Sequence, residues 1–214
     1  MTSKFSAKEA LRFGWATVKN NFWFFLALFA AIVLIYLGLG RLAAITEKNA
    51  LASALVGLVN WVIQILISIG LISIPLKFLD RRKAVFGDLV SGGRWFLKYF
   101  TASVLYMFII LGGLILLIIP GVIWAIRFQF FGYLIVDRNL GPVEALKKSW
   151  AITKGATWDL AMFSVLLMLI NMLGLLALVV GLLITAPISL LAMAFIYRKL
   201  LGSQTPQPSS TAIA

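Results

Sequence analysis

Long apolar runs separated by short polar segments dominate the pattern of this chain of 214 residues. A helix needs roughly 20 apolar residues to cross the ~30 Å hydrocarbon core of a bilayer. Four runs without a charged residue are of this length or longer: Phe22–Gly40, Ala50–Leu76, Tyr99–Ile126 and Leu160–Tyr197. The chain is therefore expected to lie largely within a membrane.

Turn signals divide the two longest of these runs. The third run contains Pro120-Gly121, and in the fourth run Gly174 and Gly181 bracket the expected turn. The pattern predicts an all-α integral membrane protein with six transmembrane helices in three hairpins. The expected spans are 22–41, 52–78, 97–118, 121–137, 157–175 and 179–198.

Basic residues fall almost entirely on one side of this predicted topology. If the N-terminus is cytoplasmic, 16 of the Lys and Arg residues lie on the cytoplasmic side. Only Arg41 and Lys48 lie outside, and Arg127 lies within a span. The positive-inside rule therefore predicts a multi-pass membrane protein with both termini in the cytoplasm.

The composition agrees with a membrane location. Hydrophobic residues make up 62% of the chain and charged residues 12%, against about 45–50% and about 25% in soluble domains. The net charge of +12 would suggest nucleic acid as the partner of a soluble protein. Because the basic residues flank apolar runs here, we expect anionic membrane lipids as partners and no nucleic acid.

An internal repeat accompanies the hairpins. A shift of 135 residues places Glu9–Ala16 on Glu144–Ala151 and Trp23 on Trp158, with seven of fifteen compared positions identical. Each copy has the pattern of a short amphipathic helix lying at the membrane interface, with Trp and basic residues. Ser6 suits the N-cap of the first copy and Pro142 the first helical position of the second.

The segment Phe86–Phe100 occupies the corresponding place before the third span, although its Gly92-Gly93 pair argues against a continuous helix. We therefore expect a single membrane domain over 1–201, with an interfacial helix before each hairpin. Its pseudo-repeats are expected at about 4–80, 84–138 and 140–200, and residues 202–214 are expected to form a disordered cytoplasmic tail.

The residue inventory restricts the chemistry. The chain has no Cys and no His, which excludes disulfides, thiol nucleophiles and imidazole bases. None of its seven acidic residues lies within a long apolar run. The sequence therefore predicts no catalytic residues, no metal site and no cofactor, and indicates a protein that is not an enzyme.

Arg127 is the most informative charged residue, because an ionisable side chain within a membrane is costly and often functional. Two interpretations are open. In the first, Arg127 only supports packing, by bonding to Gln64 or Asn171 or by stacking on Trp124. In the second, it lines a polar path together with Gln64, Asn60 and Asn171.

Basic residues of the two repeated segments are candidates for contact with anionic headgroups, since each can contribute about 1 kcal/mol near such a surface. The alternative is that they only determine topology. The candidates are Arg12, Lys19, Lys147, Lys148 and Lys154.

The clearest local signature lies between residues 119 and 158. It comprises Ile119-Pro120-Gly121, Arg127, Asp137, the run Gly141–Trp150, Thr153-Lys154-Gly155 and Trp158. This signature resembles the membrane domain attached to some glycerophosphodiester phosphodiesterases, and its stand-alone six-helix prokaryotic relatives of unknown function. Catalysis in the fused proteins belongs to a separate soluble barrel domain, so the resemblance implies a fold and a lipid setting and no phosphodiesterase activity. It also implies that the membrane is the cytoplasmic (inner) membrane of a prokaryote.

Two functions remain open from the sequence. The first is a non-catalytic membrane protein that interacts with lipid, organises the membrane or acts as a scaffold. The alternative is a small transporter or channel with Arg127 on its path, although parallel repeats lack the inverted symmetry common in secondary transporters. A homo-oligomer or a membrane-protein partner is compatible with either function.

Overall fold

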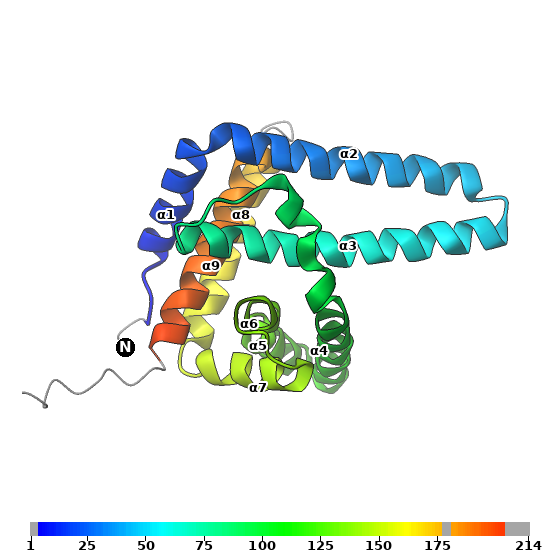
Figure 1. Cartoon of the computed structure of the whole chain (residues 1–214). Coiled ribbons are helices and arrows are strands. Elements are labelled where there is room, and N and C mark those ends of the chain that lie inside the picture. Colours follow the sequence, from blue (N-terminus) through cyan, green and yellow to red (C-terminus); the bar gives the residue numbers. More distant parts are fainter. Residues whose placement is uncertain (1–3, 177–180, 204–214) are drawn as a thin grey trace, which may run out of the picture.

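The computed structural model describes residues 4–176 and 181–203, and all regular elements in these two ranges are helical (Figure 1). The elements are α1 (Ala7–Asn20), α2 (Phe22–Thr46), α3 (Ala50–Leu79), the 3-10 turns η1 (Phe86–Leu89) and η2 (Ser91–Trp95), α4 (Phe96–Leu116), α5 (Ile118–Phe128), α6 (Phe131–Arg138), α7 (Pro142–Ile152), α8 (Thr157–Leu176) and α9 (Leu182–Gly202). Among the described residues, six segments are long and apolar enough to cross a membrane. The predicted all-α membrane fold with six such helices is confirmed.

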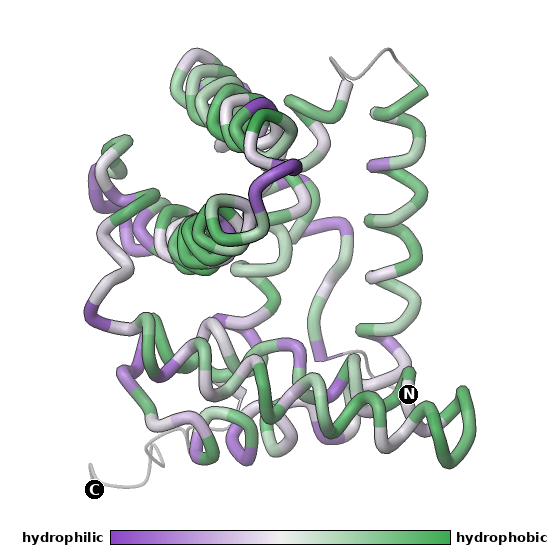
Figure 2. The backbone as a smooth tube through the Cα atoms, turned by 90° about the vertical axis from the view of Figure 1, so that its right-hand side faces the viewer, coloured by the Kyte–Doolittle hydropathy of each residue, from purple (hydrophilic) through white to green (hydrophobic). Residues whose placement is uncertain are grey.

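The helices form three hairpins that extend in different directions. In Figure 1 the α2–α3 hairpin runs across the view, α8 and α9 run steeply through it, and α4 and α5 are seen nearly end-on. Figure 2 shows the molecule from the side toward which α2 and α3 extend, and these two mostly hydrophobic helices now point at the viewer. Each hairpin thus exposes much of its apolar surface instead of burying it in one bundle.

Local sequence signals begin the helices as expected. The backbone amide of Glu9 donates to the side-chain oxygen of Ser6 over 3.3 Å, which caps α1. Pro142 occupies the first position of α7, where its missing amide proton is not needed. Asn49 caps α3 by accepting a 3.1 Å hydrogen bond from the amide of Ala52.

Two predicted boundaries are corrected. The first span continues to Thr46 instead of ending at 41, since the residues after Arg41 are mostly good helix formers. The turn before the fourth span falls at Leu117 and not at Pro120-Gly121. Pro120 lies in the first turn of α5, where backbone amides have no partner within the helix.

Two further segments differ from continuous helices. The segment before the third span, which the sequence placed at the interface, consists of the short turns η1 and η2, as the Gly92-Gly93 pair indicated. The fourth span is broken between Phe128 and Phe131 into α5 and α6. Of the predicted tail, Gly202 belongs to α9, and residues 204–214 lie outside the described part, as do residues 177–180 between α8 and α9.

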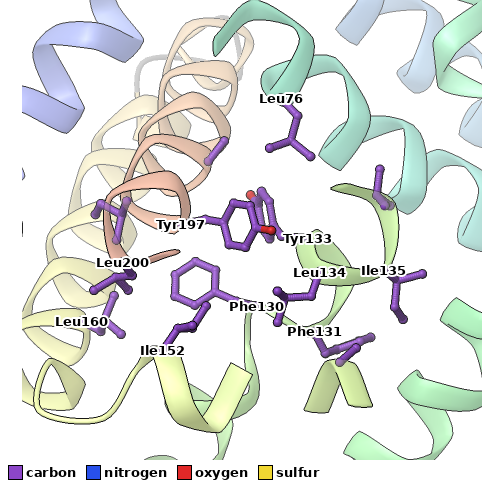
Figure 3. Close-up of a cluster of buried hydrophobic side chains, with 14 of the residues drawn as sticks. Leu76, Phe130, Phe131, Tyr133, Leu134, Ile135, Ile152, Leu160, Tyr197 and Leu200 are labelled. Atoms are coloured by element: carbon purple, nitrogen blue, oxygen red, sulfur yellow. The ribbon is translucent and has the colours of Figure 1, made fainter. Parts of the chain in front are cut away.

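The largest buried cluster lies where the ends of α3, α6 and α9 meet, a region we call the base. Leu76 of α3, Tyr133 of α6 and Tyr197 of α9 belong to this cluster, and the two tyrosine rings stack with centroids 5.2 Å apart (Figure 3). Leu134 and Ile135 of α6 are fully buried. The short helix α6 therefore forms part of the protein core and not a lipid-facing surface.

Each hairpin is preceded by a short segment that packs against the last helix of another hairpin. For the second and third hairpins this is the hairpin before it in the chain, and for the first hairpin it is the third. We call α1, η1–η2 and α7 the lead segments: α1 packs on α9, η1–η2 on α3, and α7 on α5 and α6. Two glycines permit close approach at these crossings, because a Cβ on Gly14 would meet the backbone of Ile188 and one on Gly70 would meet the backbone of Leu89. The three hairpins are thus joined in a closed cycle.

Candidate functional site

Arg127 lies where α7 crosses the end of α5. Its guanidinium carbon is 3.4 Å from the centroid of the Trp150 ring. Its Nη2 donates to the backbone carbonyl of Trp150 over 3.3 Å. A cation over an indole ring contributes about 0.5–1 kcal/mol, and ~2 kcal/mol or more when water is excluded. The face of Trp150 and its carbonyl oxygen thus offset part of the cost of burying this charge.

This contact corrects the partners proposed for Arg127 from the sequence. The stacking residue is Trp150 of α7 and not Trp124 of α5. In the described part of the chain, the side chain of Arg127 donates to Trp150 and neither to Gln64 nor to Asn171. Its buried Nε atom has no hydrogen-bond partner among the described residues.

Side-chain hydroxyls of α7 compensate for the helix break beside Arg127. A break leaves backbone groups without intrahelical partners, which is costly away from water. The hydroxyl of Ser149 donates to the carbonyl oxygen of Arg127 over 2.9 Å and accepts from the amide of Phe130 over 3.1 Å. The hydroxyl of Thr153 lies 3.2 Å from the same carbonyl oxygen, and both hydroxyl residues are fully buried.

Sequence reasoning did not identify Ser149 or Thr153 as partners of this break. Their only signal was their position on one face of the second repeated helix, four residues apart. A Ser on the buried face of a helix indicates a polar contact, but not which backbone group it meets.

Two apolar grooves lie on either side of the Arg127–Trp150 pair. The first, which we call the α7 groove, has a volume of about 630 Å³ and lies between α4, α5 and α7. It is lined by Ile109, Trp124, Phe128, Lys147 and Trp150. The second, of about 500 Å³, lies between α5 and α8 and is lined by apolar residues and Arg127. Each groove thus combines an apolar wall with one cation.

The four residues proposed for a polar path do not share one site. Asn171 donates to Ser189 over 2.9 Å and so joins α8 to α9. Asn60 and Gln64 lie exposed on α3. Arg127 lies against α7, with partners different from those of Asn171.

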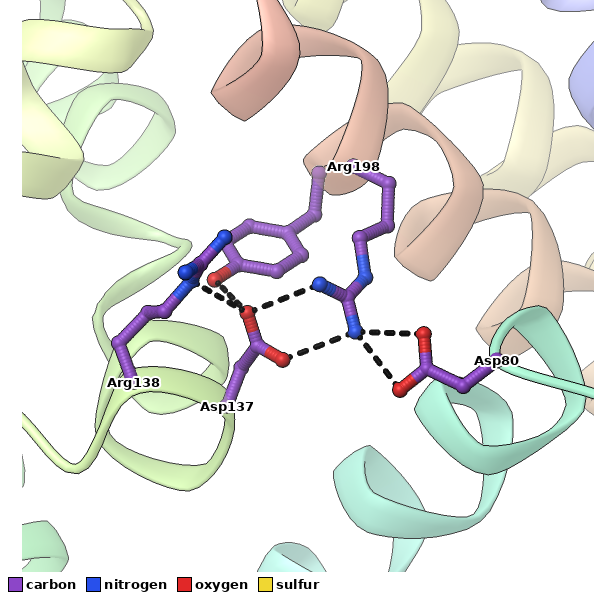
Figure 4. Close-up of polar contacts among 5 residues, drawn as sticks. Asp80, Asp137, Arg138 and Arg198 are labelled. Carbon is purple, nitrogen blue, oxygen red and sulfur yellow. Dashed lines mark hydrogen bonds and ion pairs between the residues drawn. The ribbon is translucent and has the colours of Figure 1, made fainter. Parts of the chain in front are cut away.

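A second polar cluster ties together the base (Figure 4). Nη2 of Arg198 on α9 lies 2.9 Å from a carboxylate oxygen of Asp137 and 2.9 Å from one of Asp80, which follows α3. The hydroxyl of Tyr197 donates to Asp137 over 2.9 Å, and Nε of Arg138 lies 3.1 Å from the same carboxylate. The guanidinium of Arg198 therefore links the C-terminal ends of α3, α6 and α9, the last helices of the three hairpins.

The basic candidates for headgroup contact remain available on the surface. Arg12, Lys19, Lys147, Lys148 and Lys154 are all exposed. Across residues 4–176 and 181–203, the ion pairs to acidic side chains are made by other cations, namely Lys77, Arg138, Arg198 and Lys199. In the same ranges no three potential metal-ligating side chains come together.

A family model described as "Domain of unknown function (DUF7847)" matches residues 48–214. The chain belongs to this family. The match begins in the turn before α3 and includes the α7 groove, the Arg127–Trp150 pair and the base cluster. No curated protein and no solved structure matches the chain at a significant level. For this member of the DUF7847 family, any assignment of function must therefore come from the site itself.

Proposed function

We propose that this DUF7847 protein is a non-catalytic integral membrane protein that binds anionic lipids along the surface of its lead segments. The observation that carries the proposal is the α7 groove, in which an apolar wall meets the exposed cation Lys147. An acyl chain requires the apolar wall, and an anionic headgroup is attracted by the cation. The resemblance to the membrane domain of glycerophosphodiester phosphodiesterases agrees with this lipid setting.

Unpaired charge on the lead segments supports the proposal. On α1, Ala10, Gly14 and Val18 are buried whereas Arg12 and Lys19 are exposed, as expected for an amphipathic helix at an interface. The exposed cations of both α1 and α7 have no acidic partner in the described ranges. Such cations are free to attract phosphate groups, each with a contribution of about 1 kcal/mol.

The three-unit repeat is part of the same proposal. Each lead segment has an acidic residue at its third position, namely Glu9, Asp88 or Glu144. An acid at this position favours the start of a helix or turn. Together with the closed cycle of packing contacts, this shared position supports three repeated units, each a lead segment followed by a hairpin. From the distribution of basic residues we propose that the lead segments face the cytoplasm of a prokaryotic cell.

The alternative of a transporter or channel receives no comparable support. Its proposed path needs Arg127, Gln64, Asn60 and Asn171 to line one passage, but their partners and exposure place them in separate surroundings. Lipid binding requires only surface grooves and cations, both of which are present.

Native mass spectrometry on the full chain, extracted gently with its lipids, tests the proposal. We expect retained anionic phospholipid on the wild type and markedly less on the double variant Lys147→Gln/Lys148→Gln. A matched control is Arg41→Gln/Lys48→Gln, which removes the same charge from two exposed residues at the tip of the first hairpin. Equal loss in both variants, or no retained anionic lipid on the wild type, would overturn the proposal.

A further inference from the structure

The α7 groove has the dimensions and lining of a ligand site. Its volume of about 630 Å³ lies within the ~300–1,000 Å³ typical of small-molecule sites. Its lining is four apolar or aromatic side chains and one lysine, from three different helices. An elongated apolar group with one anionic end is complementary to this arrangement.

One wall of the groove is held rigidly. Trp150 lies against Arg127, with the guanidinium carbon 3.4 Å from the ring centroid, and its centroid is 5.1 Å from that of Phe128. Behind this wall, Ser149 is hydrogen-bonded to the backbone on both sides of the helix break. A wall fixed in this way reduces the ordering cost of binding a ligand against it.

The cation is placed on the same face of α7 as the wall. Lys147 and Trp150 are three residues apart, so they are neighbours on one helical face. Lys148 is equally exposed but does not line the groove. No acidic residue lines the groove either, so nothing within it competes with an anion for Lys147.

From these features we propose that the α7 groove binds one anionic phospholipid. One acyl chain lies along Ile109, Trp124, Phe128 and Trp150, and the phosphate contacts the ammonium of Lys147. This inference rests on the proposed function and deepens it, because it assigns a single site to one lipid. A free phosphate would gain nothing from contact with the apolar wall, and an uncharged lipid would make no ion pair with the lysine.

Titration of the full chain with phosphatidylglycerol, followed by native mass spectrometry, tests the site. Loss of one basic contact of about 1 kcal/mol corresponds to an affinity about five-fold lower for Lys147→Gln. The matched control Lys148→Gln removes the same charge one residue away and is expected to bind as the wild type does. Both positions are exposed, so neither change should disturb folding.

A second pair of variants tests the acyl chain. Ile109→Trp fills the groove and is expected to lower affinity about tenfold, which corresponds to about 1.4 kcal/mol. Met107→Trp adds the same side chain at an exposed position of α4 outside the groove and should leave binding unchanged. Thermal unfolding of each variant confirms that it is folded.

Each outcome is decisive. If the wild type retains phosphatidylglycerol but all four variants bind equally, the site is wrong while the proposed function stands. If the wild type retains no phosphatidylglycerol, both fail. Equal affinity for phosphatidylcholine, or displacement of the lipid by millimolar glycerol phosphate, would overturn the anionic lipid as occupant.

Discussion

The guanidinium of Arg127 lies over the ring of Trp150, 23 residues later in the chain, with its carbon 3.4 Å from the ring centroid. The contact joins the broken fourth span to the lead segment of the next hairpin. Burying the charge of Arg127 in this apolar stretch of the sequence is costly. The aromatic face and the carbonyl oxygen of Trp150 offset part of that cost. The first prediction follows from this pair.

Arg127→Gln should lower the stability of the protein by about 1–2 kcal/mol, the worth of a partly desolvated cation–π contact. Arg127→Lys, which retains the charge but not the planar stack, should lose less. Thermal unfolding in detergent, followed by circular dichroism, measures both. If Arg127→Gln unfolds at the wild-type temperature, the stacked pair does not contribute to stability.

Ser149→Ala should destabilise the fold by about 1–3 kcal/mol, because it leaves the Arg127 carbonyl and the Phe130 amide with fewer partners in a buried place. Ser53→Ala, at an exposed position of α3, is the control and should change stability by less than about 0.5 kcal/mol. Denaturant unfolding of the two variants gives the comparison. Similar small effects at both positions would show that Ser149 does not support the helix break.

The base cluster predicts a graded response to charge removal. The side chain of Asp137 is 10% exposed, and that of Arg138 is 55% exposed. Arg198→Leu should therefore cost about 3 kcal/mol, since it leaves the buried Asp137 with only the exposed Arg138 and the uncharged Tyr197 as partners. Arg138→Gln should cost no more than about 1 kcal/mol, as expected for an exposed ion pair.

A double-mutant cycle completes this test. Adding Asp137→Asn to Arg198→Leu removes the uncompensated charge and should restore part of the lost stability. If the destabilisation of the double variant instead equals the sum of the two single effects, the two side chains are not coupled through their 2.9 Å ion pair.

Run length and local signals predicted most of the fold. Six segments of membrane length followed from the spacing of charges. The cap at Ser6 and the helix start at Pro142 followed from residue types within one helical turn. The break after Phe128 was missed, because residues 127–131 contain neither proline nor glycine. What stabilises the break is Ser149 in another helix, which local periodicity does not reveal.

The candidate site was predicted only in part. Arg127 was identified because a charge within an apolar run is conspicuous, and Lys147 because it is one of the basic residues of the repeated segments. Their shared neighbour Trp150 was interpreted only as an interfacial residue. The link between Asp137 and Arg198 spans 61 residues, and each had nearer oppositely charged neighbours in the sequence. Long-range pairs of this kind depend on how the hairpins pack against one another. The lengths of the apolar runs in the sequence do not show that packing.

The last prediction concerns the orientation of the protein, which the distribution of charge determines. Because the native chain has no cysteine, single cysteines can be introduced and labelled without background. Lys48→Cys, at the tip of the first hairpin, should react with a membrane-impermeant maleimide added outside intact cells. Lys154→Cys, after α7, should react only once the membrane is permeabilised. Labelling of position 154 in intact cells, with position 48 protected, would invert the topology and move the α7 groove to the outer face.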